Sequence, residues 1–215
     1  MAKPVSESKA QTSTVKVPWA GRRGYFDLLL GASCVILIIS NIGATKGVEF
    51  GPLPFELPLI GNTIVTDGGF FLFPLAYVIG DLLSEVYGFK RARRAIVASF
   101  SSAAFAALCF LLIVHLPPAS FYTGQEAFAQ VLGPVWQIFA GSLLGYLFGQ
   151  TLNAWVMVAI KKASKGRFLW LRMIVSTLVG ELLDTLIFCS IAAPVLGIDS
   201  MEAFLNYVLI GYIYK

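Results

Sequence analysis

Charged residues are scarce in this chain. Asp, Glu, Lys and Arg make up 13% of its 215 residues, which is about half their share in an ordinary soluble domain. Hydrophobic residues make up 57%, and the mean hydropathy is +0.78. This composition excludes an ordinary soluble domain and is typical of an integral membrane protein.

Cysteine and histidine are also rare. The sequence has 3 Cys and 1 His, and Cys34, Cys109 and Cys189 lie singly in separate apolar runs. Such spacing predicts neither a disulfide framework nor a metal cluster. Phosphate-binding glycine loops and serine hydrolase motifs are missing as well. We therefore expect no metal, no cofactor and no enzymatic activity.

The formal charge of +4 does not indicate nucleic-acid binding. The basic residues lie in short clusters between apolar runs, as the positive-inside rule describes for cytoplasmic loops. Arg22 and Arg23 precede the first apolar run, so we expect the N-terminus in the cytoplasm. All Lys and Arg residues except Lys46 then fall on the inner side.

The apolar runs predict an all-α integral membrane protein with six transmembrane helices, since one crossing needs about 20 apolar residues. The runs are 25–45, 69–87, 95–116, 134–160, 169–193 and 203–214. The last run is too short to cross, and we interpret it as an incomplete sixth helix. Between 48 and 67, Pro and Gly predict a short outer β-hairpin or loop after the first helix.

The chain divides into two unequal parts. Residues 1–18 are polar and lack helical periodicity, so we expect a disordered cytoplasmic tail. Residues 19–215 are expected to form a single transmembrane bundle that crosses the membrane several times. Its expected partner is the lipid bilayer, and a homo-oligomer is left open.

Two related motifs place acids inside apolar helices. Residues 80–88 read Gly-Asp-Leu-Leu-Ser-Glu-Val-Tyr-Gly, and residues 180–188 read Gly-Glu-Leu-Leu-Asp-Thr-Leu-Ile-Phe. Each pair of acids lies three or four residues apart and so shares a helix face. The motifs fall on the middle helix of each half of the chain. This placement predicts a 3+3 inverted repeat with a substrate site between the repeats.

Asp81, Glu85, Glu181 and Asp184 need polar surroundings, because a carboxylate at the centre of a bilayer costs roughly 2.5–3.5 kcal/mol. We expect them to face a cavity or one another, and acids within a membrane are usually functional. The alternative is that the four acids have a structural role and form hydrogen bonds with Ser, Thr, Asn and Arg of neighbouring helices. Glu85 is also near enough to the cluster at Lys90 to pair with a basic residue.

Other polar residues continue these acids as stripes at helical spacing. The predicted binding residues are Asn41, Tyr77, Asp81, Glu85, Gln150, Asn153, Thr177, Glu181 and Asp184. Tyr146 and Phe188 extend two of the stripes. Any one polar residue is equally consistent with hydrogen bonding between helices, and Gly141, Gly145 and Gly149 predict close helix packing rather than ligand contact.

Four motifs carry a resemblance to a known family. They are Ser40-Asn41, Phe73-Pro74-Leu75, the run from Gly80 to Arg93, and the run from Ser176 to Thr185. Together they resemble the queuosine precursor transporter family, from about residue 25 to the C-terminus. The resemblance implies a six-helix vitamin-uptake-type importer of 7-deazaguanines, namely the 7-cyano or 7-aminomethyl precursor of queuine. It also implies a small purine-like molecule as partner and a multi-pass location in the inner membrane. Asn153 stands where an acid is common in relatives.

The implied ligand agrees with the acids. A guanine-like ring presents two adjacent N–H donors, and a carboxylate accepts both in bidentate geometry. We expect Glu181 or Asp81 in this role, with Asn41, Gln150 or Asn153 binding the acceptors of the ring and an aromatic side chain stacking on it. Import is then facilitated, or coupled to a proton shared by two close carboxylates.

Two functions of other classes stay open. One is a substrate-binding subunit of an ATP-driven vitamin importer. The other is an intramembrane aspartyl protease with Asp81 and Asp184 as its dyad, although Val78 stands where such enzymes have the first glycine of a Gly-x-Gly-Asp motif.

Overall fold

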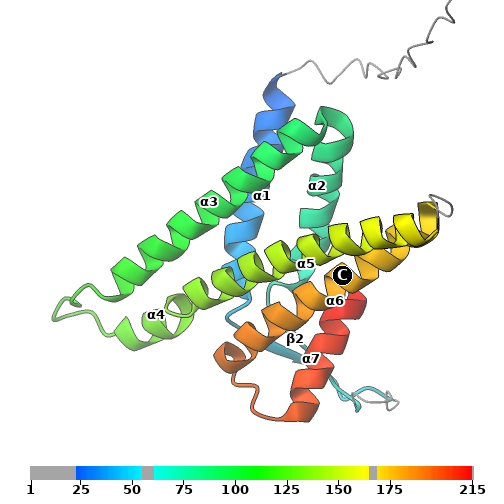
Figure 1. Ribbon diagram of the computed structural model, residues 1–215. Helices are drawn as coiled ribbons and strands as arrows, with labels where there is room; N and C mark the ends of the chain where they lie inside the picture. Colours follow the sequence, from blue (N-terminus) through cyan, green and yellow to red (C-terminus); the bar gives the residue numbers. More distant parts are fainter. Residues whose placement is uncertain (1–22, 55–60, 165–168, 215) are drawn as a thin grey trace, which may run out of the picture.

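A computed structural model describes residues 23–54, 61–164 and 169–214 of the chain. These residues are mostly helical, and a two-stranded sheet accompanies the helices (Figure 1). The helices are α1 Arg23–Gly43, α2 Phe73–Tyr87, α3 Phe89–Val114, α4 Gln125–Leu132, α5 Val135–Ala163, α6 Leu169–Leu196 and α7 Met201–Tyr214, and a short 3-10 helix, η1, spans Phe70–Leu72. The tail predicted at 1–18 lies outside the described residues.

The helices pack in two groups (Figure 1). α1, α2 and α3 contact one another, α6 contacts both α5 and α7, and the two groups meet where α3 and α1 touch α5. α1 begins at the end of the molecule where α2 turns into α3, and the sheet lies at the opposite end. The two helix groups therefore face each other across the middle of the molecule.

Among the described residues, four helices are long and apolar enough to cross a membrane. The candidate spans are Tyr25–Gly43, Lys90–Val114, Gln125–Ala163 and Trp170–Leu196. α2 has 15 residues and α7 has 14, which is fewer than a straight crossing needs. Six crossings, the inverted repeat and the orientation in the membrane therefore stay predictions.

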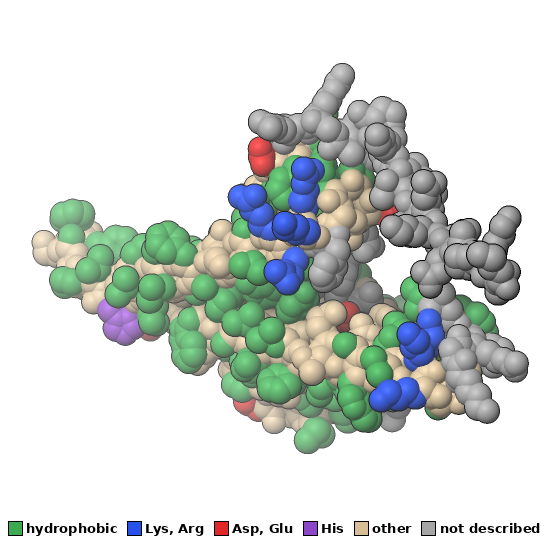
Figure 2. Space-filling view, turned by 45° about the horizontal axis from the view of Figure 1, so that its top comes forward, with side chains coloured by type: hydrophobic (Ala, Val, Ile, Leu, Met, Phe, Trp, Pro, Cys, Tyr) green, Lys and Arg blue, Asp and Glu red, His purple; other side chains and the backbone are tan. Residues whose placement is uncertain are grey.

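The surface has the apolar character that a bilayer requires. Figure 2 shows hydrophobic side chains over most of the visible face, with Lys and Arg gathered in two groups. Exposed basic residues lie at the start of α3, from Lys90 to Arg94, and at the end of α5, at Lys161 and Lys162. The charges thus lie at helix ends, where headgroups and water are accessible.

Two segments differ from the predicted runs. Helix α4 lies between the runs 95–116 and 134–160, where the hydropathy predicted no helix. α6 extends beyond the predicted end at 193, includes Pro194 and ends at Leu196. Gly197, with φ of +71°, reverses the chain there in the left-handed conformation that commonly terminates helices. Pro194 lies in the last turn of α6, where its missing N–H removes one backbone hydrogen bond to the preceding turn.

The hairpin predicted after the first helix is confirmed as an antiparallel pair. β1 Gly47–Phe50 pairs with β2 Ile64–Asp67, and Gly47 lies opposite Asp67. Successive side chains of a strand point to opposite faces, and the neighbours Thr66 and Asp67 are both buried. Both faces of β2 are therefore covered at its C-terminal end.

Two neighbouring residues of α7 hold this hairpin. Asn206 accepts a hydrogen bond from the backbone N–H of Val65 at 2.9 Å, and its side-chain amide donates to the carbonyl of Thr63 at 2.7 Å. Tyr207 donates its hydroxyl to Oδ2 of Asp67 at 2.7 Å. Asn206 and Tyr207 are buried, so α7 belongs to the core of the fold.

Glycine allows α5 and α6 to pack as an antiparallel pair at very short distance. A Cβ added at Gly149 would lie 2.8 Å from both Asp184 Cβ and the carbonyl oxygen of Gly180. A Cβ added at Gly180 would lie 2.7 Å from Asn153 Cβ, and one at Gly141 would lie 3.3 Å from Ile191. The packing role predicted for these glycines is confirmed, and it follows the small-residue pattern of membrane helices.

Replacing Gly149 by Ala is expected to force α5 away from α6. Overpacking of this kind typically costs about 1–3 kcal/mol, so the Gly149→Ala variant should unfold at a lower temperature in detergent. Gly31→Ala on α1 is the control, because no atom lies within 4 Å of an added Cβ there. Equal melting temperatures for the two variants would contradict the packing role of Gly149.

Candidate functional site

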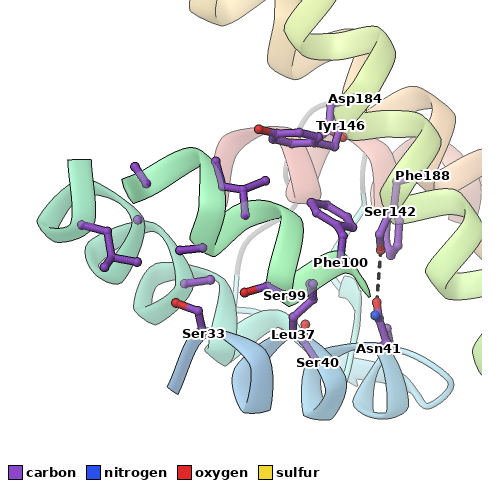
Figure 3. A pocket seen from close by; sticks show the side chains of 17 residues that line it. Ser33, Leu37, Ser40, Asn41, Ser99, Phe100, Ser142, Tyr146, Asp184 and Phe188 are labelled. Carbon is purple, nitrogen blue, oxygen red and sulfur yellow. Dashed lines mark hydrogen bonds between the residues drawn. The ribbon is translucent and has the colours of Figure 1, made fainter. Parts of the chain in front are cut away.

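A cavity of about 270 Å³ lies where the two helix groups meet, and we call it the main cavity. α1, α2, α3, α5 and α6 all contribute to its wall (Figure 3). Its lining is largely apolar with a few polar groups, which is the usual composition of a small-molecule pocket. The volume lies just below the roughly 300–1,000 Å³ of typical ligand pockets, so it suits a small ligand.

Asn41 supplies an amide to the main cavity from the C-terminal end of α1. It is 4% exposed, and its Oδ1 accepts a hydrogen bond from Ser142 Oγ of α5 at 3.2 Å, drawn as a dashed line in Figure 3. The contact ties α1 to α5 across the boundary between the helix groups. Because the amide oxygen binds Ser142, the amide nitrogen is the group of Asn41 suited to donate to a ligand.

Three aromatic rings line the same cavity. Phe100 of α3 and Tyr146 of α5 form a tilted pair with ring centroids 5.2 Å apart, and Phe188 of α6 is buried. Figure 3 shows the Tyr146 ring next to Asp184 and Phe188 next to Ser142. Aromatic faces of this kind stack well on flat heterocyclic rings.

A second cavity, of about 110 Å³, lies between α5 and α6, and we call it the inner cavity. Five predicted residues line it, namely Gln150, Asn153, Thr177, Glu181 and Asp184. Asn153 Oδ1 is buried with no hydrogen-bond partner in the part of the chain that the structure describes. Buried polar atoms without a partner are rare in folded proteins, so this amide oxygen is suited to bind an occupant of the cavity.

Asp184 and Tyr146 line both cavities. Asp184 and Glu181 are separated by one helical turn on α6, as their spacing predicts. Asp184 therefore places a carboxylate at the junction, and Glu181 places a second one in the inner cavity. The acids of the second motif are thus brought together with Gln150 and Asn153, while Asn41 lies on the other side of the main cavity.

Only part of the first motif can be placed relative to the cavities. Gly80 lines the main cavity, and the structure describes Tyr77 and Asp81 as part of α2 but not their side chains. Their predicted roles stay predictions. Glu85 is exposed near the end of α2 and lines neither cavity.

Several lining residues did not belong to the predicted set. Phe100 lies on a face of α3 with no acid or amide, so no local pattern singles it out. Ser142, Tyr146 and Phe188 do extend predicted stripes, since Ser142 lies one turn before Tyr146, Tyr146 one turn before Gln150, and Phe188 one turn after Asp184. The signal for these three was therefore present in the helical spacing.

The chain is similar to known transporters. Residues 67–215 match the family described as "Putative vitamin uptake transporter". A protein of Bacillus subtilis (strain 168) named "Probable queuosine precursor transporter" is 32% identical over 179 residues, which cover 83% of this chain and 72% of that protein. The "Queuosine precursor transporter" of Escherichia coli (strain K12) is 33% identical over 141 residues, covering 64% of this chain and 59% of that protein. No solved structure matches the chain significantly.

The hydrogen bond between Asn41 and Ser142 is expected to couple the two helix groups energetically. A double-mutant cycle with Asn41→Ala and Ser142→Ala should give a coupling of about 0.6 kcal/mol and at most about 1.7 kcal/mol, the range found for hydrogen bonds between membrane helices. Ser190→Ala is the control partner for Asn41→Ala, since Ser190 Oγ donates to Leu186 on its own helix. Zero coupling for the first pair in unfolding experiments would contradict the assignment.

Proposed function

The chain belongs to the vitamin uptake transporter family, and on that premise we propose that it imports queuosine precursors of the 7-deazaguanine class. It is a multi-pass membrane protein, and in bacteria proteins of this family lie in the inner membrane. One observation carries the choice of ligand. The carboxylate of Asp184 lies at the edge of a cavity that Phe100, Tyr146 and Phe188 line with aromatic rings.

The geometry matches the chemistry of a guanine-like base. Such a ring is flat, so it stacks on aromatic side chains, and its two adjacent N–H groups fit one carboxylate in bidentate geometry. We assign this carboxylate to Asp184. The sequence favoured Glu181 or Asp81, but Glu181 lines the inner cavity.

The remaining polar groups have complementary roles. We assign the amide nitrogen of Asn41 to an acceptor at the far edge of the ring, since its amide oxygen already accepts from Ser142. Glu181 is one helical turn from Asp184, where a second negative charge would offset the cation of an aminomethyl substituent. The 7-cyano and 7-aminomethyl compounds should therefore differ in their dependence on Glu181.

Uptake into proteoliposomes that contain this chain alone tests the proposal. We expect import of radiolabelled 7-cyano- or 7-aminomethyl-7-deazaguanine without ATP, and a loss of about tenfold to 150-fold in affinity for Asp184→Asn. The estimate follows from the roughly 1.5–3 kcal/mol that a hydrogen bond to a charged group contributes. Glu181→Gln should weaken binding of the aminomethyl compound more than binding of the cyano compound.

Two matched variants serve as controls. Asp27→Asn and Glu126→Gln make the same chemical changes at exposed positions of α1 and α4, and both should transport normally. Unchanged uptake by Asp184→Asn would refute the site. Uptake that requires an ATP-driven partner would instead identify the chain as a binding subunit of such an importer.

The driving force is either the concentration gradient of the ligand or a proton gradient. Glu181 and Asp184 both line the inner cavity, and two close carboxylates readily share a proton. If they carry the coupling proton, an inward pH gradient should accelerate uptake and an uncoupler should abolish the acceleration. Uptake that is indifferent to both treatments would show that the passage is facilitated.

A further inference from the structure

Four basic residues gather at the N-terminal end of α3. Lys90, Arg91, Arg93 and Arg94 are all exposed there, and they form one of the two groups of Lys and Arg in Figure 2. In the part of the chain that the structure describes, none of them forms an ion pair. No acid of the described chain therefore matches their positive charge.

The polarity of the helix makes this placement unfavourable. The N-terminus of a helix carries partial positive charge and N–H groups that have no partner within the helix. Among the described residues, no side chain caps α3 at Gly88, and its first turn contains no acid. Lys161 and Lys162, by contrast, lie in the last turn of α5, where the helix end is negative and basic residues are stabilising. Of the two basic groups, the one on α3 therefore gains more from a bound anion.

Two aromatic rings hold the guanidinium of Arg91. Its central carbon lies over the rings of Phe26 of α1 and Tyr87 of α2, at 5.9 Å from each centroid, and the two rings pack edge to face at 5.3 Å. Stacking uses the face of a guanidinium and leaves the N–H groups in its plane available to a phosphate in bidentate geometry. Arg91 is thus a preorganised phosphate donor at the point where α1, α2 and α3 meet.

The surface next to these charges is apolar. Lys90, Arg94 and Val97 follow one another at intervals of four and three residues and so share a helix face. Val97 is 60% exposed, and it lies in the candidate membrane span that begins at Lys90. A free phosphate would use only the basic residues, whereas a phospholipid would also place its acyl chains against this apolar face.

We propose that the start of α3 binds an anionic phospholipid, with Lys90, Arg91 and Arg94 around the headgroup phosphate. A zwitterionic lipid also has a phosphate, but it brings a cation of its own, which the uncompensated positive charge of α3 disfavours. Clusters of four or more basic residues beside a membrane helix attract anionic headgroups in general. The uncapped helix end and the stacked Arg91 add a defined position for one lipid.

The position of the site suggests how the lipid would act on transport, a step that rests on the proposed function. Ala92 and Ala95 lie on the buried side of the same two turns of α3 and line the main cavity, as does Gly80 of α2. A lipid bound at the corner of α1, α2 and α3 would hold this wall of the cavity in place.

Thermal unfolding of the purified chain in detergent tests the lipid site without any transport substrate. Phosphatidylglycerol in the micelles should raise the melting temperature above its value with the same amount of phosphatidylcholine. Once the site is more than half occupied, each further tenfold increase in phosphatidylglycerol should add roughly 3–5 °C for a chain of this length. Sodium chloride at about 1 M should reduce the rise, since it shortens the Debye length to about 3 Å. Inorganic phosphate without lipid should not reproduce it.

Two double variants that each remove two positive charges locate the effect. Lys90→Gln with Arg94→Gln should lose most of the response to phosphatidylglycerol, whereas Lys161→Gln with Lys162→Gln should keep it. Arg91→Lys retains the charge without the planar guanidinium, so it should respond more weakly than the wild type. Each response is measured against the melting temperature of the same variant in phosphatidylcholine, which separates loss of the lipid from loss of stability.

Three results would overturn the proposal. Equal wild-type melting temperatures in the two lipids would show that no anionic lipid binds selectively. An equal rise with inorganic phosphate alone would identify a free anion as the ligand. Equal responses of the two double variants would show a general attraction of charge rather than a site on α3. None of these results depends on uptake, so the proposed function would remain to be judged by its own experiment.

Discussion

Most of the structure depends on how closely α5 and α6 approach each other. Without side chains at Gly149 and Gly180, the two backbones meet directly, and Asp184 is held against α5. α6 in turn lines both the main cavity and the inner cavity. The backbone contact at these glycines adds to the side-chain packing of Phe188, Cys189 and Ala192 in the core, and together they fix the position of α6.

The same contact explains how acids are accommodated in an apolar chain. A carboxylate facing lipid is unfavourable, but Asp184 and Glu181 face spaces between helices that also contain amides and hydroxyls. Asp67 is treated differently, since the backbone of Gly69 and the hydroxyl of Tyr207 donate to it directly. Negative charge is thus distributed over the middle of the molecule, and each acid has surroundings of its own.

The sequence predicted those features that depend on local pattern. Apolar runs located α1, α3, α5 and α6, the Pro- and Gly-rich segment located the hairpin, and helical spacing brought Gln150, Asn153, Glu181 and Asp184 to one cavity. Features that depend on contacts between distant segments were missed. Asp67 and Tyr207 are 140 residues apart, and no period in the sequence relates them. Phe100 acquires its role only because α3, α5 and α1 converge, and the same convergence gives Ser142 its partner Asn41.

The two related motifs use their first glycine in opposite ways. At Gly180 the missing side chain makes room for a helix, and any larger residue there collides with Asn153. At Gly80 nothing lies within 4 Å of an added Cβ, and the space belongs to the main cavity. Residue 80 can therefore gain a side chain while the contact of α5 with α6 stays intact. Under the proposed function, such a change in α2 would alter the size of ligand that the main cavity accepts and leave the helix packing unchanged.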